Sequence, residues 1–123
     1  MLALQRRIKL IKKLDVSVPS HCALMNPAAD KLKILLEPMV FNTPHIPVIQ
    51  NANAATAKNS AEIKSALFQQ LSSPVRWVES MENMARDFAP DVIIECGPGK
   101  VLAGLNKRIV NIPTISIEEA LHV

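Results

Sequence analysis

Apolar and polar positions change their period along this 123-residue chain, and the last third has the clearest pattern. The run DVIIEC at 91–96 is apolar throughout most of its length, as in a strand buried on both faces. The turn GPGK at 97–100, the helical stretch VLAGLNKRIV at 101–110 and a second strand, IPTISI at 112–117, follow. Four apolar positions of this helix are expected to face inward: Val101, Leu102, Leu105 and Ile109. The order strand, helix, strand predicts a βαβ unit with parallel strands and a right-handed crossover.

Helical spacing also marks a segment near residue 30. Asn26 followed by Pro27 is typical of an N-cap and a first-turn proline, and Pro38 closes the helix that begins there. Three leucines at helical spacing form its apolar side: Leu32, Leu35 and Leu36.

Two more helices are predicted between residues 59 and 90. Asn59 and Glu62 match a capping box with asparagine as the cap. One apolar face of the helix that follows contains Ile63, Ala66, Leu67 and Leu71. Pro74 starts a second helix, and Pro90 lies just past its end. The inner face of this second helix is formed by Trp77, Met81, Met84 and Phe88.

Two weaker patterns indicate strands earlier in the chain. Residues 8–17, IKLIKKLDVS, alternate loosely, and residues 46–51, IPVIQN, form a short run that favours β structure after a proline-containing loop. Together with the βαβ unit, these runs indicate a mixed α/β fold.

Composition limits the classes of protein that remain. Hydrophobic residues make up 49% of the chain and aromatic residues 3%, so one domain with a core of Leu, Ile, Val, Ala and Met is expected. The net charge of +3 and the pI near 9.1 are too mild to indicate nucleic acid. Basic residues nevertheless crowd the first thirteen positions: Arg6, Arg7, Lys9, Lys12 and Lys13. A solvated face is the ordinary interpretation of such a run, and an acidic partner is the alternative.

The two cysteines, Cys22 and Cys96, have no metal-ligand spacing and are interpreted as reduced thiols of a cytoplasmic protein. The start MLALQRRIKL is unlike a secretory signal, because its basic residues follow a very short apolar run. No apolar stretch approaches the roughly 20 residues that a membrane-spanning helix needs.

The GPGK turn is a weak candidate for an anion site. It lacks the spacing of a P-loop, and Gly97 and Gly99 lack the third glycine of a dinucleotide fingerprint. A helix N-terminus can hold an anion with its free N–H groups. The ordinary use of such glycines is a turn with unusual backbone angles, and both interpretations stay open on local grounds.

His21 is a candidate general base without a candidate nucleophile. Neighbouring residues of an extended segment point to opposite faces, so a Cys22–His21 pair is not expected. A serine nucleophile of an α/β enzyme needs a G-x-S-x-G elbow, and none of the three glycines, Gly97, Gly99 and Gly104, flanks a serine. The other titratable candidates have no evident partner or make no convincing acid–base pair: His45, His122, Glu118 and Glu119.

Three blocks of the sequence closely resemble the C-terminal part of the malonyl-CoA:acyl-carrier-protein transacylases of bacterial fatty acid synthesis. They are VSVPSHCALM at 16–25, QLSSPVRW at 70–77 and ECGPGKVLAGLNKRI at 95–109, in the order and spacing of that family. The likeness runs from about residue 9 to 117. Polyketide-synthase acyltransferase domains share looser versions of the same blocks.

The resemblance implies an α/β-hydrolase-like fold interrupted by a small ferredoxin-like subdomain. Residues 1–16 would be the tail of the small subdomain, and residues 17–123 the C-terminal part of the large acyltransferase subdomain.

The resemblance also implies an activity, which is ping-pong transfer of malonyl from coenzyme A to the phosphopantetheine thiol of acyl carrier protein. It assigns the general base to His21 and gives the backbone carbonyl of Gln70 the task of orienting that histidine. Gly97, Pro98 and Gly99 are implied to be structural. Malonyl-CoA and acyl carrier protein are the expected partners, with no cofactor, metal, nucleic acid or membrane.

The family's serine elbow, its malonyl-binding arginine and its oxyanion-hole amides belong to an N-terminal portion that this sequence does not contain. A C-terminal fragment, a split gene product or an internal start is therefore expected, with the N-terminal half as a further partner. The alternative is a catalytically dead truncated product that binds acyl carrier protein or has a structural role. A parallel sheet without its neighbours leaves an open edge and an uncovered apolar face, so the isolated chain is expected to associate.

Overall fold

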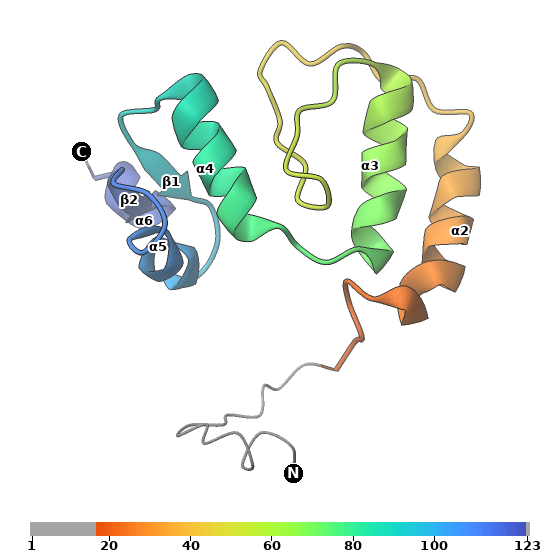
Figure 1. The fold of residues 1–123 in the computed structure, drawn as a ribbon, viewed down its shortest axis with the longest axis horizontal. Helices are drawn as coiled ribbons and strands as arrows, with labels where there is room; N and C mark the ends of the chain where they lie inside the picture. Colours follow the sequence, from red (N-terminus) through yellow and green to blue (C-terminus); the bar gives the residue numbers. More distant parts are fainter. Residues whose placement is uncertain (1–16, 123) are drawn as a thin grey trace.

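The computed structural model describes residues 17–122, which form a mixed α/β arrangement (Figure 1). In chain order the elements are η1 (Ala23–Met25), α2 (Asn26–Leu36), α3 (Ser60–Ser72), α4 (Trp77–Phe88), β1 (Ile93–Glu95), α5 (Val101–Asn106), β2 (Thr114–Ser116) and α6 (Ile117–Ala120). The expected strand at 8–17, the basic stretch and the subdomain tail at 1–16 lie wholly or almost wholly outside the described residues.

Helix α2 begins one residue earlier than its sequence pattern predicts. Asn26 is its first residue and Met25 its N-cap, because the 3₁₀ turn η1 leads directly into the helix. The Asn26 backbone is already helical, and its N–H donates to the carbonyl of Ala23. The helix ends at Leu36, before Pro38 as predicted. Leu36 is buried, whereas Leu35 is exposed, so the predicted apolar side is only partly covered.

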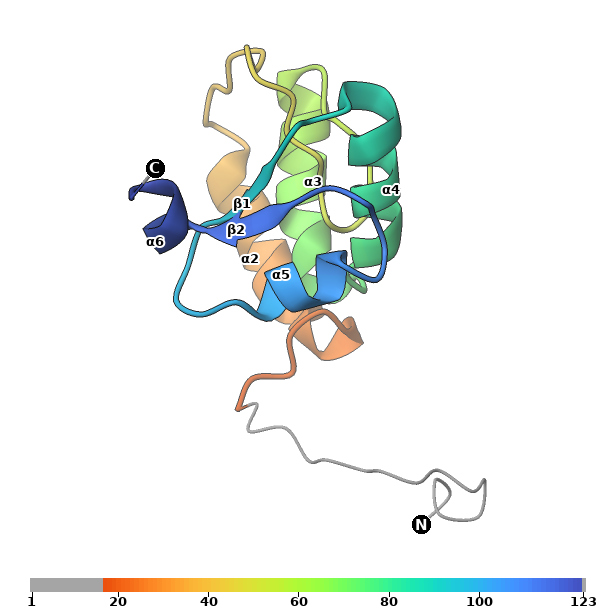
Figure 2. The ribbon, with the colours of Figure 1, turned by 90° about the vertical axis from the view of Figure 1, so that its left-hand side faces the viewer.

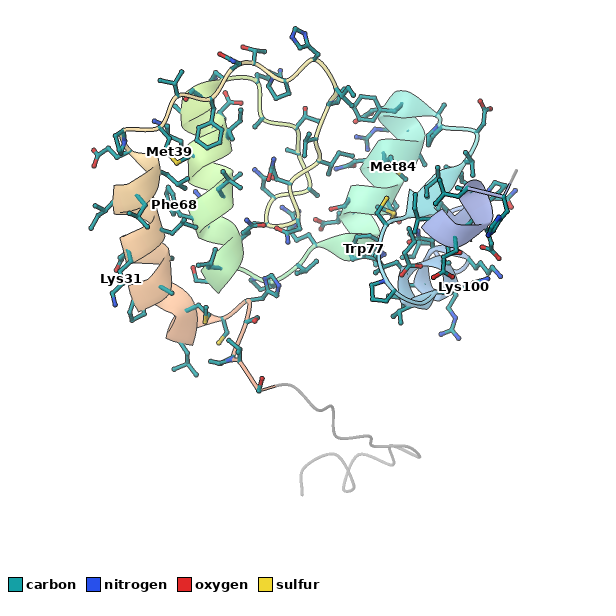
Figure 3. All side chains as sticks on the ribbon, turned by 180° about the vertical axis from the view of Figure 1, so that it is seen from behind. Lys31, Met39, Phe68, Trp77, Met84 and Lys100 are labelled. Carbon is teal, nitrogen blue, oxygen red and sulfur yellow. The ribbon has the colours of Figure 1, made fainter. Side chains whose placement is uncertain are left out.

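Helix α3 begins where its cap predicts. The Asn59 side chain accepts a hydrogen bond from the Glu62 N–H at 3.0 Å. The Glu62 carboxylate accepts from the Lys58 N–H at 2.7 Å, one residue earlier than in a standard capping box. Ala66 is buried where α3 packs beside α2. Phe68 lies between the two helices, with the Lys33 ammonium 5.5 Å from its ring centroid (Figure 3).

The segment between α2 and α3 lies between α3 and α4 in space (Figure 1). The predicted strand at 46–51 is reduced there to one antiparallel bridge, Ile49 to Thr56, with the Gln50 N–H donating to the Ala55 carbonyl at 2.9 Å. Pro47 has no N–H to give to a ladder, and this explains why no longer strand forms.

Helix α4 starts at Trp77, three residues later than the Pro74 start that the sequence predicts. Arg76 is the N-cap of α4, and its backbone N–H donates a hydrogen bond to the carbonyl of Asn51 at 2.8 Å. Met81 is buried on the predicted inner face, but Phe88 at its far end is 44% exposed. The helix ends in a left-handed residue, Ala89, just before Pro90.

The predicted βαβ unit is confirmed. Strands β1 and β2 are parallel, with Ile93 opposite Thr114 and Glu95 opposite Ser116, and α5 connects them (Figure 2). The sequence predicts that the strand at 91–96 is buried on both faces. In the part of the chain that the structure describes, this prediction is wrong, because Ile94 is 43% exposed.

Helix α5 is shorter and turned differently from its prediction. It ends at Asn106, and its buried residues are Ala103 and Asn106, while Val101 is 71% exposed. Asn106 accepts from the Trp77 indole N–H at 3.0 Å and donates to the Thr114 hydroxyl at 3.4 Å. These polar contacts decide which face of α5 turns inward, although its branched residues are more apolar.

Small residues dominate the core of the described chain. The buried apolar residues are Ala29, Leu36, Ala54, Ala66, Met81 and Ala103. The branched residues that the composition predicts for the core are therefore largely at the surface. Between residues 17 and 122, no helix is long and apolar enough to cross a bilayer.

Candidate active site

His21 has a backbone conformation that few residues other than glycine adopt. Its φ is 60°, in the left-handed region, on the turn that follows Pro19. A residue other than glycine pays about 1 kcal/mol or more for such a conformation, so surrounding contacts have to hold it. Backbone outliers of this kind cluster at functional sites.

Those contacts come from the last turn of α3. The final carbonyls of a helix have no partner within the helix. The Gln69 carbonyl receives the Ser73 N–H at 3.0 Å, and the Leu71 carbonyl receives the His21 N–H at 3.0 Å. The Gln70 carbonyl lies 2.8 Å from Nδ1 of the His21 ring. The structure therefore brings together His21 and Gln70, 49 residues apart, through main-chain groups that α3 cannot satisfy itself.

The Gln70 contact determines which ring nitrogen carries the proton. A carbonyl oxygen only accepts hydrogen bonds, so Nδ1 is the donor and Nε2 of the neutral ring has a free lone pair. Within residues 17–122, Nε2 makes no hydrogen bond, and the imidazole is exposed. The arrangement orients the imidazole and leaves its Nε2 without a partner among these residues.

The neighbouring thiol does not take part. The Cys22 Sγ donates to the Pro19 carbonyl at 3.2 Å, so it is engaged with its own turn. Both cysteines carry free thiols.

The backbone N–H groups that follow the GPGK turn bind a carboxylate of this chain, that of Glu95. Gly99 has a φ of 89°, as a glycine turn predicts. Glu95 is buried, and its two oxygens accept the N–H groups of Leu102 at 3.0 Å and Ala103 at 2.9 Å. These are the groups that an external anion would need, so the anion-site hypothesis for this turn is wrong.

Sequence reasoning missed Glu95. It is the last residue of β1 and stands five residues before the N-cap of α5. A carboxylate between an apolar strand and a glycine turn was the available signal, since acidic groups favour helix N-termini.

Glu119, near the end of the described chain, has a structural role. The Glu119 carboxylate pairs with the Lys100 ammonium and accepts from the Ser116 N–H at 2.9 Å, closing the capping box of α6. The hydrogen bond from Lys100, and then that from Ser116, lower the pKa of Glu119 to about 2. Glu119 is thus tied to the end of the GPGK loop, with its carboxylate ionised at neutral pH.

An apolar cavity lies apart from His21. It has a volume of about 400 Å³ and runs along α4 beside the 46–51 segment. Trp77 and Met84 of α4 line it (Figure 3). Among residues 17–122 no group of three or more His, Cys, Asp or Glu side chains could hold a metal ion.

The mixed α/β fold, with a histidine held by a helix-end carbonyl, is similar to part of the fold of solved acyltransferases that transfer malonyl. The structure of the acyl carrier protein S-malonyltransferase of Vibrio cholerae superposes with a TM-score of 0.87 at 44% identity, over 98% of this chain and 41% of that one. A malonyl-transacylase solved in complex with a type II polyketide-synthase acyl-carrier protein superposes with a TM-score of 0.79 at 46% identity, over 85% of this chain and 34% of that one.

The curated relatives agree with these structures. The malonyl CoA-acyl carrier protein transacylase of Haemophilus influenzae is 51% identical over 107 residues, which is 86% of this chain and 34% of the relative. No family model matches the chain. The predicted resemblance to the C-terminal portion of these transacylases, which are acyltransferase enzymes, is confirmed. This chain spans about a third of the length of the curated relatives it matches.

Proposed function

We propose that this chain supplies the general base of a malonyl-CoA:acyl-carrier-protein transacylase. One observation carries the proposal. In a left-handed turn, His21 donates from Nδ1 to the Gln70 carbonyl at 2.8 Å, which leaves Nε2 without a partner among residues 17–122. The catalytic base is then His21, and Gln70 is the positioning residue whose main-chain carbonyl orients it.

In the first half of the proposed reaction, a serine hydroxyl from the N-terminal portion of the enzyme attacks the thioester carbonyl of malonyl-CoA. His21 Nε2 takes the hydroxyl proton, because an alcohol is a poor nucleophile until a base removes that proton. The tetrahedral intermediate collapses, the C–S bond breaks, and the imidazolium returns the proton to the departing coenzyme A thiolate. Malonyl is left as an ester on the serine.

In the second half, the phosphopantetheine thiol of acyl carrier protein gives its proton to Nε2 and attacks the ester. The C–O bond to serine breaks, and the imidazolium restores the serine hydroxyl. The proton returns to its starting place, so the exchange consumes no co-reactant. The similarity to a transacylase solved with its acyl-carrier protein supports this choice of acceptor.

The proposal includes a division of the chain. Residues 1–16 are the tail of a small ferredoxin-like subdomain, and residues 17–123 are part of the large acyltransferase subdomain. The extent of the structural match, 98% of this chain against a solved transferase, supports a continuous piece of one acyltransferase.

The test is a fused enzyme in which this chain replaces the matching third of the Haemophilus influenzae relative. Malonyl transfer to acyl carrier protein is measured with His21→Ala and, as a control, His45→Ala in the exposed loop before α3. Loss of the base is expected to lower kcat by about 10²–10⁴-fold, because general-base catalysis contributes that much. His45→Ala is expected to leave kcat unchanged.

Equal activity of the two variants contradicts the base assignment. If the wild-type fusion forms no malonyl-serine but the chain binds acyl carrier protein in a salt-sensitive way, the non-catalytic binding module is the better account.

A further inference from the structure

A short link joins the helix end that holds His21 to the start of α4. Gln70 lies two residues before the last residue of α3, and α4 begins at Trp77 (Figure 1). Only residues 73–76 separate the two helices. Pro74 has a fixed φ, and it restricts the residue before it to an extended backbone. A link this short and stiff transmits a displacement of the start of α4 to the end of α3.

The start of α4 is held on two sides. Arg76 donates from its main-chain N–H to the Asn51 carbonyl at 2.8 Å and from its guanidinium to the Asn53 carbonyl at 3.3 Å. On the other side, the Trp77 indole N–H donates to Oδ1 of Asn106 in α5 at 3.0 Å (Figure 3). Trp77 is thus the side chain that ties this end of α4 to the βαβ unit.

The partner of the indole is itself fixed in place. Asn106 is 1% exposed, and its amide donates to the Thr114 hydroxyl of β2 at 3.4 Å. A buried acceptor that loses its donor is costly, so the Oδ1 of Asn106 favours a single position of the indole. Between residues 17 and 122, no other hydrogen bond joins α4 to residues 91–122. The position of α4 on the βαβ unit therefore depends on this contact.

We propose that Trp77 is a positioning residue for His21. The inference rests on the proposed function. The hydrogen bond to Asn106 fixes the start of α4, and the link at 73–76 passes that position to the last turn of α3. The Gln70 carbonyl is thereby kept 2.8 Å from Nδ1 of His21.

A displaced Gln70 carbonyl would change the chemistry of the imidazole. The hydrogen bond of one ring nitrogen decides which nitrogen carries the proton. When the bond at Nδ1 weakens, the proton of the neutral ring can move to Nε2, and the lone pair that takes the serine proton is then lost. Trp77 acts in this way through main-chain geometry and needs no contact with the reacting atoms.

The test uses Trp77→Phe and Asn106→Leu in the fused enzyme, which remove the donor and the acceptor of the same hydrogen bond. The His21 ring is observed by ¹⁵N NMR after labelling with ¹⁵N-histidine, at a pH where the imidazole is neutral. In both variants we expect a larger fraction of rings with the proton on Nε2. We also expect kcat to fall by about tenfold or more with the KM for malonyl-CoA unchanged, because small misplacements of a catalytic group are costly.

Asn83→Ala is the matched control. It removes another side-chain hydrogen bond of α4, from the Asn83 amide to the Ala54 carbonyl at 2.8 Å, away from the link to α3. We expect a lower melting temperature, with the His21 spectrum and kcat of the wild-type fusion. Thermal melts of all three variants separate a loss of stability from a change at the histidine.

Three results overturn the positioning role of Trp77. One is an unchanged His21 spectrum in both Trp77→Phe and Asn106→Leu. Another is the same spectral change in Asn83→Ala, because a general loss of stability would then be the cause. The third is unchanged kcat in an enzyme that needs His21. If neither Trp77→Phe nor Asn106→Leu folds, the contact serves folding alone and the proposal is also overturned.

These results are distinguishable from a failure of the proposed function. The nitrogen spectrum does not depend on turnover, so a shifted proton in Trp77→Phe supports the positioning of the ring even if the fused enzyme transfers no malonyl. If His21→Ala abolishes transfer while Trp77→Phe keeps the wild-type spectrum and kcat, His21 is the base and Trp77 does not position it.

Discussion

His21 is oriented entirely by main-chain atoms. Its N–H and its Nδ1 meet two consecutive carbonyls at the end of α3, those of Leu71 and Gln70. A helix always leaves such carbonyls free, so the acceptors do not depend on which side chains the helix carries. His21 is therefore oriented without a carboxylate partner.

Lys100 and Glu119 form an ion pair that should be visible in a titration. Lys100 lowers the pKa of Glu119 from its ordinary value of 4.5 to about 2, with help from the Ser116 N–H. A carboxyl with a depressed pKa stabilises the fold above pH 4.5, and that stabilisation is lost as the pH falls toward 2.

We expect Lys100→Met to move the pKa of Glu119 back toward 4.5, as measured by carboxyl ¹³C NMR. Lys107→Met, on the residue that follows α5, is the matched control and should leave that pKa low. If the pKa of Glu119 is the same in Lys100→Met as in the wild-type chain, the ion pair does not form in solution.

In helix α5, polar contacts determine which residues face inward. It has six residues and an apolar side made of Val101, Leu102 and Leu105, yet its inward residues are Ala103 and Asn106. The Glu95 carboxylate holds its first turn, and the contacts of Asn106 hold its last.

Removal of the Glu95 carboxylate should loosen α5. Glu95→Ala leaves the Leu102 and Ala103 N–H groups without their acceptor, and we expect a loss of about 2 kcal/mol of stability. Glu95→Gln keeps one acceptor oxygen and should lose less. Hydrogen exchange at the two amides, measured in the fused enzyme, reports the local effect. Unchanged exchange in Glu95→Ala would mean that the carboxylate does not cap the helix.

Caps were predictable at some helices and not at others. Asn59 caps α3 as expected, because its side chain needs only a donor three residues on in the same chain. Asn26 has the same residue type before a proline, but the 3₁₀ turn that precedes it makes it the first residue of α2. The start of α3 depends on a contact between residues close together in the chain. The start of α2 depends on how the turn at His21 leads into the helix.

The whole molecule exposes much of its apolar side-chain surface. Among the most exposed are Leu24, Ile34, Leu35, Val40, Ile46, Val101 and Leu121. Large exposed apolar patches indicate interaction sites or a tendency to aggregate. A net charge of only +3 gives weak electrostatic protection against association.

We therefore expect the isolated 123-residue chain to self-associate as its concentration rises. Analytical ultracentrifugation should show a broad distribution of sizes, and a dye that binds exposed apolar surface should fluoresce. A monodisperse monomer with a cooperative thermal transition would contradict this expectation.

The amino-acid sequence by itself determined the βαβ unit, the end of α2, the start of α3 and the turn at Gly99, because each depends on residues close together in the chain. It also determined the resemblance to the transacylases through three separated blocks. The tertiary structure alone decided that the Gln70 carbonyl reaches His21, that Glu95 occupies the start of α5, and that Ile94 of β1 is 43% exposed among residues 17–122. Periodicity says which residues avoid water, whereas the partners of main-chain groups at helix ends and strand edges depend on where distant segments pack.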